Sequence, residues 1–180
     1  MKIEINLEHI QKLGKEKEDE NLEFRAFLKQ HDMLSEEMDA YVHEILDEVS
    51  SKIDCTKCAN CCKQVRPVFD KDDISRFALS LEISESAFRK QYLNVYEDSP
   101  SKFSLKEIPC PFLKNDQCTY YGHRPTDCRS YPHLQKDDFI FRLWSVIGNY
   151  EICPIVFNVY EQLKIELWHN DLYEDGDSWV

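Results

Sequence analysis

Four cysteines lie within eight residues, and this cluster constrains the chain more than any other feature of its sequence. Cys55, Cys58, Cys61 and Cys62 follow the spacing Cys-x-x-Cys-x-x-Cys-Cys. A Cys-x-x-Cys turn brings two sulfurs close to one point, and this spacing is typical of tetrahedral thiolate sites and iron–sulfur clusters. The cluster therefore predicts a segment whose fold is organised around bound metal.

The other four cysteines lie on separate turns further along the chain. Cys110 lies in Pro-Cys-Pro-Phe-Leu, Cys118 follows a polar turn, and Cys128 lies between two arginines in Arg-Pro-Thr-Asp-Cys-Arg. Cys153 precedes Pro154, and because proline is favoured at the first helical position, we expect Cys153 at the N-cap of a helix, where thiolate is favoured. The predicted metal ligands are Cys55, Cys58, Cys61, Cys62, Cys110, Cys118, Cys128 and Cys153.

The redox state of the cellular compartment decides whether the eight cysteines form disulfides or bind metal. The first residues lack the apolar core of a secretory signal, and no run approaches the ~18 apolar residues of a membrane span. We therefore expect a cytoplasmic protein with no membrane partner. Thiols stay reduced in the cytoplasm, so metal binding is favoured over four disulfides.

The charge pattern argues against a nucleic-acid partner. The net charge is −12, with 15 acidic and 7 basic side chains in residues 1–54, a balance of 15 to 15 in residues 55–170, and a charge of −4 from 171 onward. No basic face is predicted, so a phosphate backbone would be repelled. Four isolated glycines also exclude a glycine-rich nucleotide loop. The expected partners are metal ions and an unidentified protein.

Apolar periodicity predicts several helices. The three- and four-residue steps from Leu34 to Ile53 indicate one helix with Ser35 as its N-cap. Helices are also expected after Asp70, after Ser84 and from Pro154. Residues 66–69 are predicted to be extended, and the aromatic and β-branched run 139–147 favours a strand, with a buried helix as the alternative.

Together these elements predict a fold that is mainly α with short β segments. We expect an acidic, amphipathic helical region at 1–54 that packs on a small metal-stapled cysteine-cluster domain at 55–170. An acidic tail follows at 171–180.

The cysteine motifs resemble those of the YkgJ-type cysteine-cluster family of zinc- or iron-chelating domain proteins. The similarity runs from about Asp54 to Asn170 and includes Cys-Pro-Phe-Leu at 110–113, Arg-Pro-x-x-Cys-Arg at 124–129 and Cys153-Pro154. It implies metal binding through the eight cysteines. Ala59-Asn60 stands where many relatives have a glycine-containing pair. A flagellin lysine-methylase group is related to the family, but no methyl-donor pocket is recognisable here, so that activity is not carried over.

Thiolates select zinc or iron–sulfur clusters over calcium and magnesium. The side chains of adjacent Cys61 and Cys62 are expected to point in different directions, so that the two residues serve different sites or bridge two metals. One partition assigns Cys55, Cys58, Cys61 and Cys153 to a [4Fe–4S] cluster, and Cys62, Cys110, Cys118 and Cys128 to zinc or a second cluster. Two zinc sites fit the same count.

Polar residues near the cysteines have assignable roles. His123 and His133 flank Cys128 and are alternative ligands or hydrogen-bond donors to sulfur, or else polar loop residues. Arg124 and Arg129 are expected to offset thiolate charge or, alternatively, to bind an anion. Asp72 and Asp73 are expected to support a helix N-terminus.

Two classes of function remain open. The favoured class is a non-catalytic metalloprotein, in which saturated thiolate sites leave no open coordination position. The alternative is an iron–sulfur enzyme of redox or group-transfer type.

Overall fold

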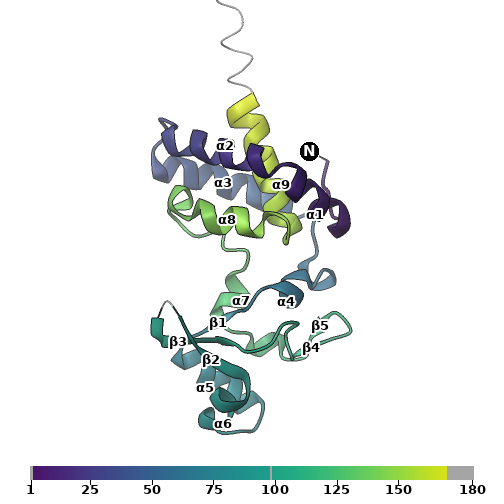
Figure 1. The fold of residues 1–180 in the computed structure, drawn as a ribbon, viewed down its shortest axis with the longest axis vertical. Coiled ribbons are helices and arrows are strands. Elements are labelled where there is room, and N and C mark those ends of the chain that lie inside the picture. Colours follow the sequence, from purple (N-terminus) through teal and green to yellow (C-terminus); the bar gives the residue numbers. More distant parts are fainter. Residues whose placement is uncertain (1, 98, 170–180) are drawn as a thin grey trace, which may run out of the picture. The chain divides into compact units, whose positions relative to one another are not determined.

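The computed structural model describes residues 2–97 and 99–169, and the predicted acidic tail lies outside them. The chain divides into two compact units (Figure 1). We call residues 2–54 and 132–169 the helical unit and residues 55–131 the cysteine unit. Over the described ranges, every helix falls short of the length and apolar character that a membrane crossing requires.

The helical unit is built on one amphipathic helix and one largely buried helix that pack together. Helix α3 (Ser35–Ser50) lies against α9 (Pro154–Leu163), which continues into a π-helical turn at Lys164–His169. Helices α1 (Leu7–Glu16), α2 (Glu18–Gln30) and α8 (Leu143–Tyr150) complete the unit, with a 3-10 turn at Phe139–Arg142 before α8. The predicted face of α3 is buried at Met38, Val42, Ile45, Leu46 and Val49.

Three details of this unit differ from the sequence-based expectation. Ser35 is the first residue of α3 and not its N-cap, which is Leu34, whose N–H donates to the Glu37 carboxylate. Residues 139–147 form no strand, since Phe139, Leu143, Val146 and Tyr150 bury one helical face. Residues 132–169, which the predicted division placed with the cysteines, pack with the N-terminal helices because α9 offers its apolar face to α3.

The cysteine unit surrounds a small antiparallel sheet of order β1-β3-β2. Strand β3 (Ser99–Leu105) pairs with β1 (Val68–Phe69) in the register Val68↔Ser104, and with β2 (Leu93–Tyr96) in the register Leu93↔Leu105. Helices α5 (Lys71–Ser80) and α6 (Glu85–Tyr92) pack together beside it, capped by Asp70 and Ser84 as predicted. The mainly α fold with short β segments is thus confirmed.

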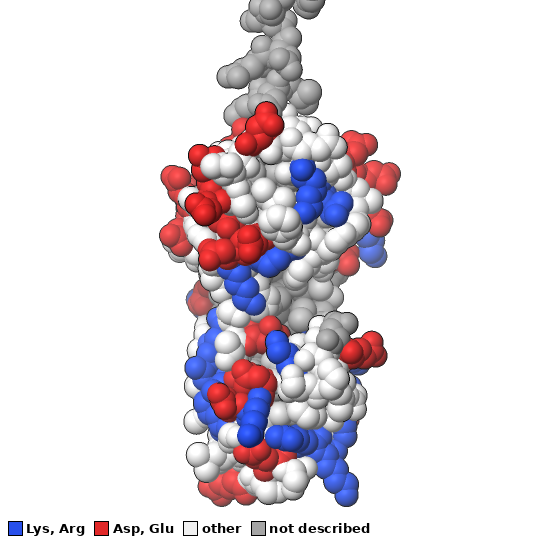
Figure 2. Space-filling view, turned by 90° about the vertical axis from the view of Figure 1, so that its left-hand side faces the viewer, with Lys and Arg blue, Asp and Glu red and all other residues white. Residues whose placement is uncertain are grey.

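The remaining elements of the cysteine unit are short and carry the cysteines. They are a 3-10 turn (Cys55–Lys57), α4 (Asn60–Gln64), the hairpin β4 (Leu113–Lys114) and β5 (Gln117–Cys118), a 3-10 turn (Tyr121–His123) and α7 (Thr126–Ser130). On the face drawn in Figure 2, each unit carries both acidic and basic side chains.

Candidate metal centre

The first cysteine cluster forms two consecutive turns. The Cys58 N–H donates to the Cys55 carbonyl at 3.2 Å, and Ala59 then adopts the left-handed conformation, with φ of 51°. This reversal starts α4 at Asn60 and places Cys61 and Cys62 in its first turn. Left-handed backbone favours glycine because a Cβ is crowded there, so Ala59 occupies a position that glycine would fit with less strain.

Cys110 and Cys118 are held next to this helix by a tight hairpin. Asn115 and Asp116 both have positive φ, which is the geometry of a two-residue turn between β4 and β5. The Cys110 N–H donates to the Cys62 carbonyl at 2.8 Å, and the Lys63 ammonium lies 2.6 Å from the Asp116 carboxylate. The hairpin is therefore tied to α4 at its base and at its tip.

A buried aromatic cluster packs against the segment that leads into this hairpin. Phe112, in the Cys-Pro-Phe-Leu motif, is 6% exposed, and its ring centroid lies 4.7 Å from that of Phe77 in α5. Phe69 and Phe88 belong to the same buried cluster, and Cys110 packs against it. Burial of Phe112 thus fixes the segment that carries Cys110.

Five cysteines line one cavity of about 80 Å³ in the cysteine unit. They come from α4, from the hairpin and from α7: Cys61, Cys62, Cys110, Cys118 and Cys128. Apolar side chains, including Val65, Phe69 and Phe77, form much of the remaining wall. Adjacent Cys61 and Cys62 line the same cavity.

The other three predicted ligands do not line this cavity. Cys55 is exposed and Cys58 is half-buried on the preceding turn. Cys153 belongs to the helical unit, where it is the N-cap of α9 with Pro154 as the first helical residue, as predicted. None of the eight cysteines, all of which the structure describes, is joined in a disulfide.

The thiols of the cavity interact electrostatically. A hydrogen bond from Cys61 lowers the pKa of Cys62 to about 7, with help from the charges of Arg124 and Lys63 and against the effect of burial. Burial, and then the charges of Cys62 and Cys118, raise the pKa of Cys110 to about 11. Burial also raises the pKa of Cys118 and of Cys128, and the charge of Cys62 adds to both shifts.

These mutual effects identify Cys62, Cys110, Cys118 and Cys128 as one interacting set. Burial first, and repulsion by neighbouring thiolates second, favour the protonated forms of Cys110, Cys118 and Cys128. A bound metal cation would offset this repulsion and release the protons.

Two arginines near the cavity have different surroundings. Arg124 lines the cavity, and its guanidinium carbon lies 3.4 Å from the centroid of the Tyr121 ring. The Arg129 guanidinium contacts the backbone instead, since its Nε donates to the Arg124 carbonyl at 2.8 Å. His123 is exposed in the 3-10 turn, and His133 lies in the helical unit, where its carbonyl accepts from Arg142. The guanidinium placed to offset thiolate charge is therefore that of Arg124.

The donor set fits a soft metal. Within the residues that the structure describes, no three His, Cys, Asp or Glu side chains are already arranged to hold a metal ion. Four sulfur donors, a nearby guanidinium and apolar walls are the surroundings in which thiolate-bound zinc and iron–sulfur clusters occur.

The small α/β unit and its converging thiols define a metal-binding cysteine-cluster protein. The chain belongs to the YkgJ-type CxxCxxCC family, whose model, described as "Putative zinc- or iron-chelating domain", matches residues 54–145. Searches of curated proteins and of solved structures gave no match.

The residue that sequence reasoning undervalued is Asp73. It was expected only to support the start of a helix, and it does form a capping box with Asp70. It also contacts the segment that carries Cys128, which lies more than fifty residues away. The capping spacing could reveal the first role, but no local signal reveals the second.

Proposed function

We propose that this protein is a cytoplasmic metal-binding protein in which Cys62, Cys110, Cys118 and Cys128 bind one soft metal centre, either zinc or an iron–sulfur cluster. The observation that carries the proposal is the convergence of these four thiols, from three separate segments, on one cavity. The mutual effects on their pKa values support the same grouping.

The surroundings of the cavity suit such a centre. Four thiolates around a divalent cation leave an excess of negative charge, which Arg124 and Lys63 would partly offset. The apolar wall lowers the local dielectric and limits access of water. A site with four sulfur ligands leaves no open coordination position, so we propose a structural, storage or electron-carrying role in preference to catalysis.

A second centre would use the exposed end of the first cluster. Cys55, Cys58 and Cys61 lie on consecutive turns, a spacing that suits an iron–sulfur cluster. Because Cys61 also lines the cavity, its sulfur is available to bridge this second centre and the centre in the cavity.

Anaerobic purification of the full chain, followed by measurement of iron, zinc and acid-labile sulfide, tests the proposal. Zinc without sulfide identifies a thiolate zinc site, and equal iron and sulfide identify a cluster. Cys128→Ser should lose the metal of the cavity, whereas Cys55→Ser, outside the cavity wall, should retain it. Compactly folded protein that has never met air or chelator, and yet contains neither metal, would refute the proposal.

A further inference from the structure

The helix that carries Cys128 is too short to hold its own position. Helix α7 has five residues, and an isolated helix of this length is unstable in water because nucleation is costly. Its place therefore depends on contacts with the rest of the cysteine unit. One is the hydrogen bond from the Val68 N–H to the Asp127 carboxylate, at 2.9 Å.

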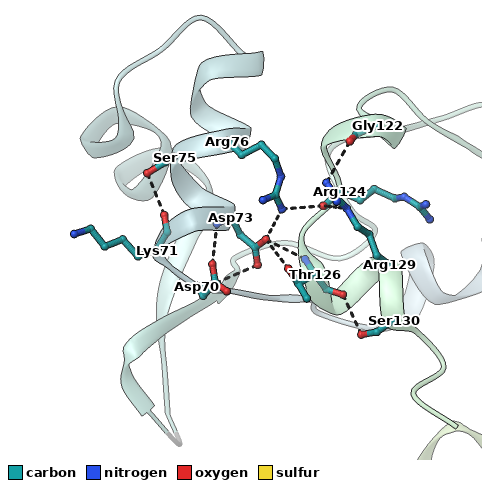
Figure 3. A network of polar contacts seen from close by, with 10 residues as sticks. All are labelled: Asp70, Lys71, Asp73, Ser75, Arg76, Gly122, Arg124, Thr126, Arg129 and Ser130. Atoms are coloured by element: carbon teal, nitrogen blue, oxygen red, sulfur yellow. Dashed lines mark hydrogen bonds and ion pairs between the residues drawn. The ribbon is translucent and has the colours of Figure 1, made fainter. Parts of the chain in front are cut away.

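The second attachment is made by Asp73 of α5, at the first residue of α7 (Figure 3). One oxygen of the Asp73 carboxylate, Oδ1, accepts from the Thr126 N–H at 3.0 Å and from the Thr126 hydroxyl at 3.1 Å. The same oxygen accepts from Arg76. Asp73 is only 2% exposed, so these bonds act in surroundings of low dielectric, where they are strong.

Arg76 extends this contact to the residues before α7. Its Nη2 donates to the Arg124 carbonyl at 3.2 Å, and Arg129 donates to the same oxygen. The Arg124 carbonyl oxygen thus accepts hydrogen bonds from two guanidinium groups, which fixes the backbone at this residue. Asp73 and Arg76 together fix the segment that carries both Cys128 and the Arg124 guanidinium, and both of these line the cavity.

Asp73 caps α5 together with Asp70, but that local role needs no contact with Thr126. A buried ion pair contributes little net stability compared with an apolar pair, although losing one partner is costly. The hydrogen bonds of Asp73 instead specify a position for the start of α7, two residues before Cys128.

We propose that Asp73, with Arg76, is a positioning residue for the metal centre, which sets where Cys128 enters the coordination sphere. This inference rests on the proposed function of the cavity. Residues that orient a metal ligand change metal affinity by about ten- to a hundredfold when they are removed. The bonds of Asp73 to Thr126 lead directly to α7, so its effect should be largest at Cys128.

The test uses the full chain loaded with Co²⁺, whose thiolate charge-transfer absorption reports the number of bound sulfurs. Asp73→Ala should weaken Co²⁺ binding ten- to a hundredfold and lower this absorption toward that of Cys128→Ser. Asp73→Asn keeps one acceptor oxygen for Thr126 and should restore most of both. Asp72→Ala is the matched control, since this exposed neighbour in the same helical turn should leave both unchanged.

The outcomes separate the inference from the function on which it rests. Should the wild-type protein show no thiolate absorption with Co²⁺ and contain neither zinc nor an iron–sulfur cluster when purified anaerobically, the metal centre itself is refuted. Wild-type absorption that Asp73→Ala leaves at full strength and affinity would overturn the positioning role alone. If Asp73→Ala does not fold, Thr126→Val decides, because it removes the hydroxyl bond to Asp73 and leaves the capping box of α5 in place. A spectrum and an affinity of Thr126→Val equal to those of Asp72→Ala would overturn the positioning role.

Discussion

The Lys164 ammonium lies 2.7 Å from a carboxylate oxygen of Glu161, and only 1% of the Lys164 side chain is exposed. Glu20 lies 2.8 Å from the same ammonium, and the Tyr150 hydroxyl donates to Glu161 at 2.7 Å. The Lys17 ammonium pairs with both Glu20 and Glu161 as well, so two carboxylates and two ammonium groups share a partly buried corner of the helical unit.

Loss of one charge from this corner should destabilise the protein. We expect Glu161→Gln to lower the free energy of unfolding by about 3 kcal/mol, because it leaves the buried ammonium with less compensation. Glu16→Gln, which removes an exposed pair with Lys12, is the control and should change little. Urea unfolding followed by circular dichroism measures both, and equal effects of the two variants would contradict the expectation.

The same carboxylate should make stability depend on pH. Burial raises the pKa of Glu161, but hydrogen bonds from Lys164 and Lys17 outweigh burial and hold it below its ordinary value. Its stabilisation is therefore fully present above the unfolded-state pKa, about 4.3, and is lost as pH falls through the lower folded-state pKa. Unfolding measured from pH 7 to pH 3 should show a steeper decline for the wild type than for Glu161→Gln, and parallel curves would contradict this.

Two glycines in the helical unit should respond oppositely to alanine. A Cβ on Gly14 in α1 would lie 2.7 Å from the Cβ of Glu151, whereas nothing lies within 4 Å of one on Gly148 in α8. Gly148→Ala should stabilise by about 1 kcal/mol through helix propensity. Gly14→Ala should destabilise, since the backbone near Glu151 must shift. Thermal unfolding compares them, and a gain for both would rule out the close approach at Gly14.

Replacement of Ala59 by glycine should increase the free energy of unfolding. Its φ of 51° crowds the Cβ, so Ala59→Gly should stabilise the cysteine unit by about 1 kcal/mol. Ala87→Gly, at an exposed position within α6, should instead destabilise by about 1 kcal/mol. Denaturant unfolding of both variants under identical metal conditions makes the comparison, and a loss at both sites would count against strain at Ala59.

Metal removal should affect one part of the cysteine unit first. The segments with Cys110, Cys118 and Cys128 have short elements, whereas α5 and α6 enclose the buried cluster of Phe69, Phe77 and Phe88. With the proposed metal chelated, hydrogen exchange should accelerate over 110–131 and change less over 71–92. Uniform acceleration over both ranges would contradict this, and unchanged exchange would argue against a metal in the cavity.

Local signals in the sequence predicted three helix starts. Asp70, Ser84 and Cys153-Pro154 mark helix starts through capping, which depends on residues within one turn. The strand expected at 139–147 was wrong because β-branched and aromatic composition was weighed above spacing. The four- and three-residue steps of Phe139, Leu143, Val146 and Tyr150 carry the helical signal.

The grouping of the cysteines could be predicted only in part. Spacing favours Cys55, Cys58 and Cys61 as neighbours, because a turn of three residues limits where sulfurs lie. No spacing shows that Cys61 faces the same cavity as Cys128, or that Asp73 reaches Thr126. Those relationships depend on the packing of Phe112 and α5, which are contacts between residues distant in the chain.

The bond from the Cys110 N–H to the Cys62 carbonyl has a consequence for synthesis. A growing chain releases the first four cysteines well before Cys110 leaves the ribosome, because proteins emerge from the N-terminus. During that interval the linear cluster is a set of exposed thiols without its later partners. A metal ion that arrives during this interval would meet only the cysteines of the first cluster. Its binding there would precede the folding of the Cys110 segment around it.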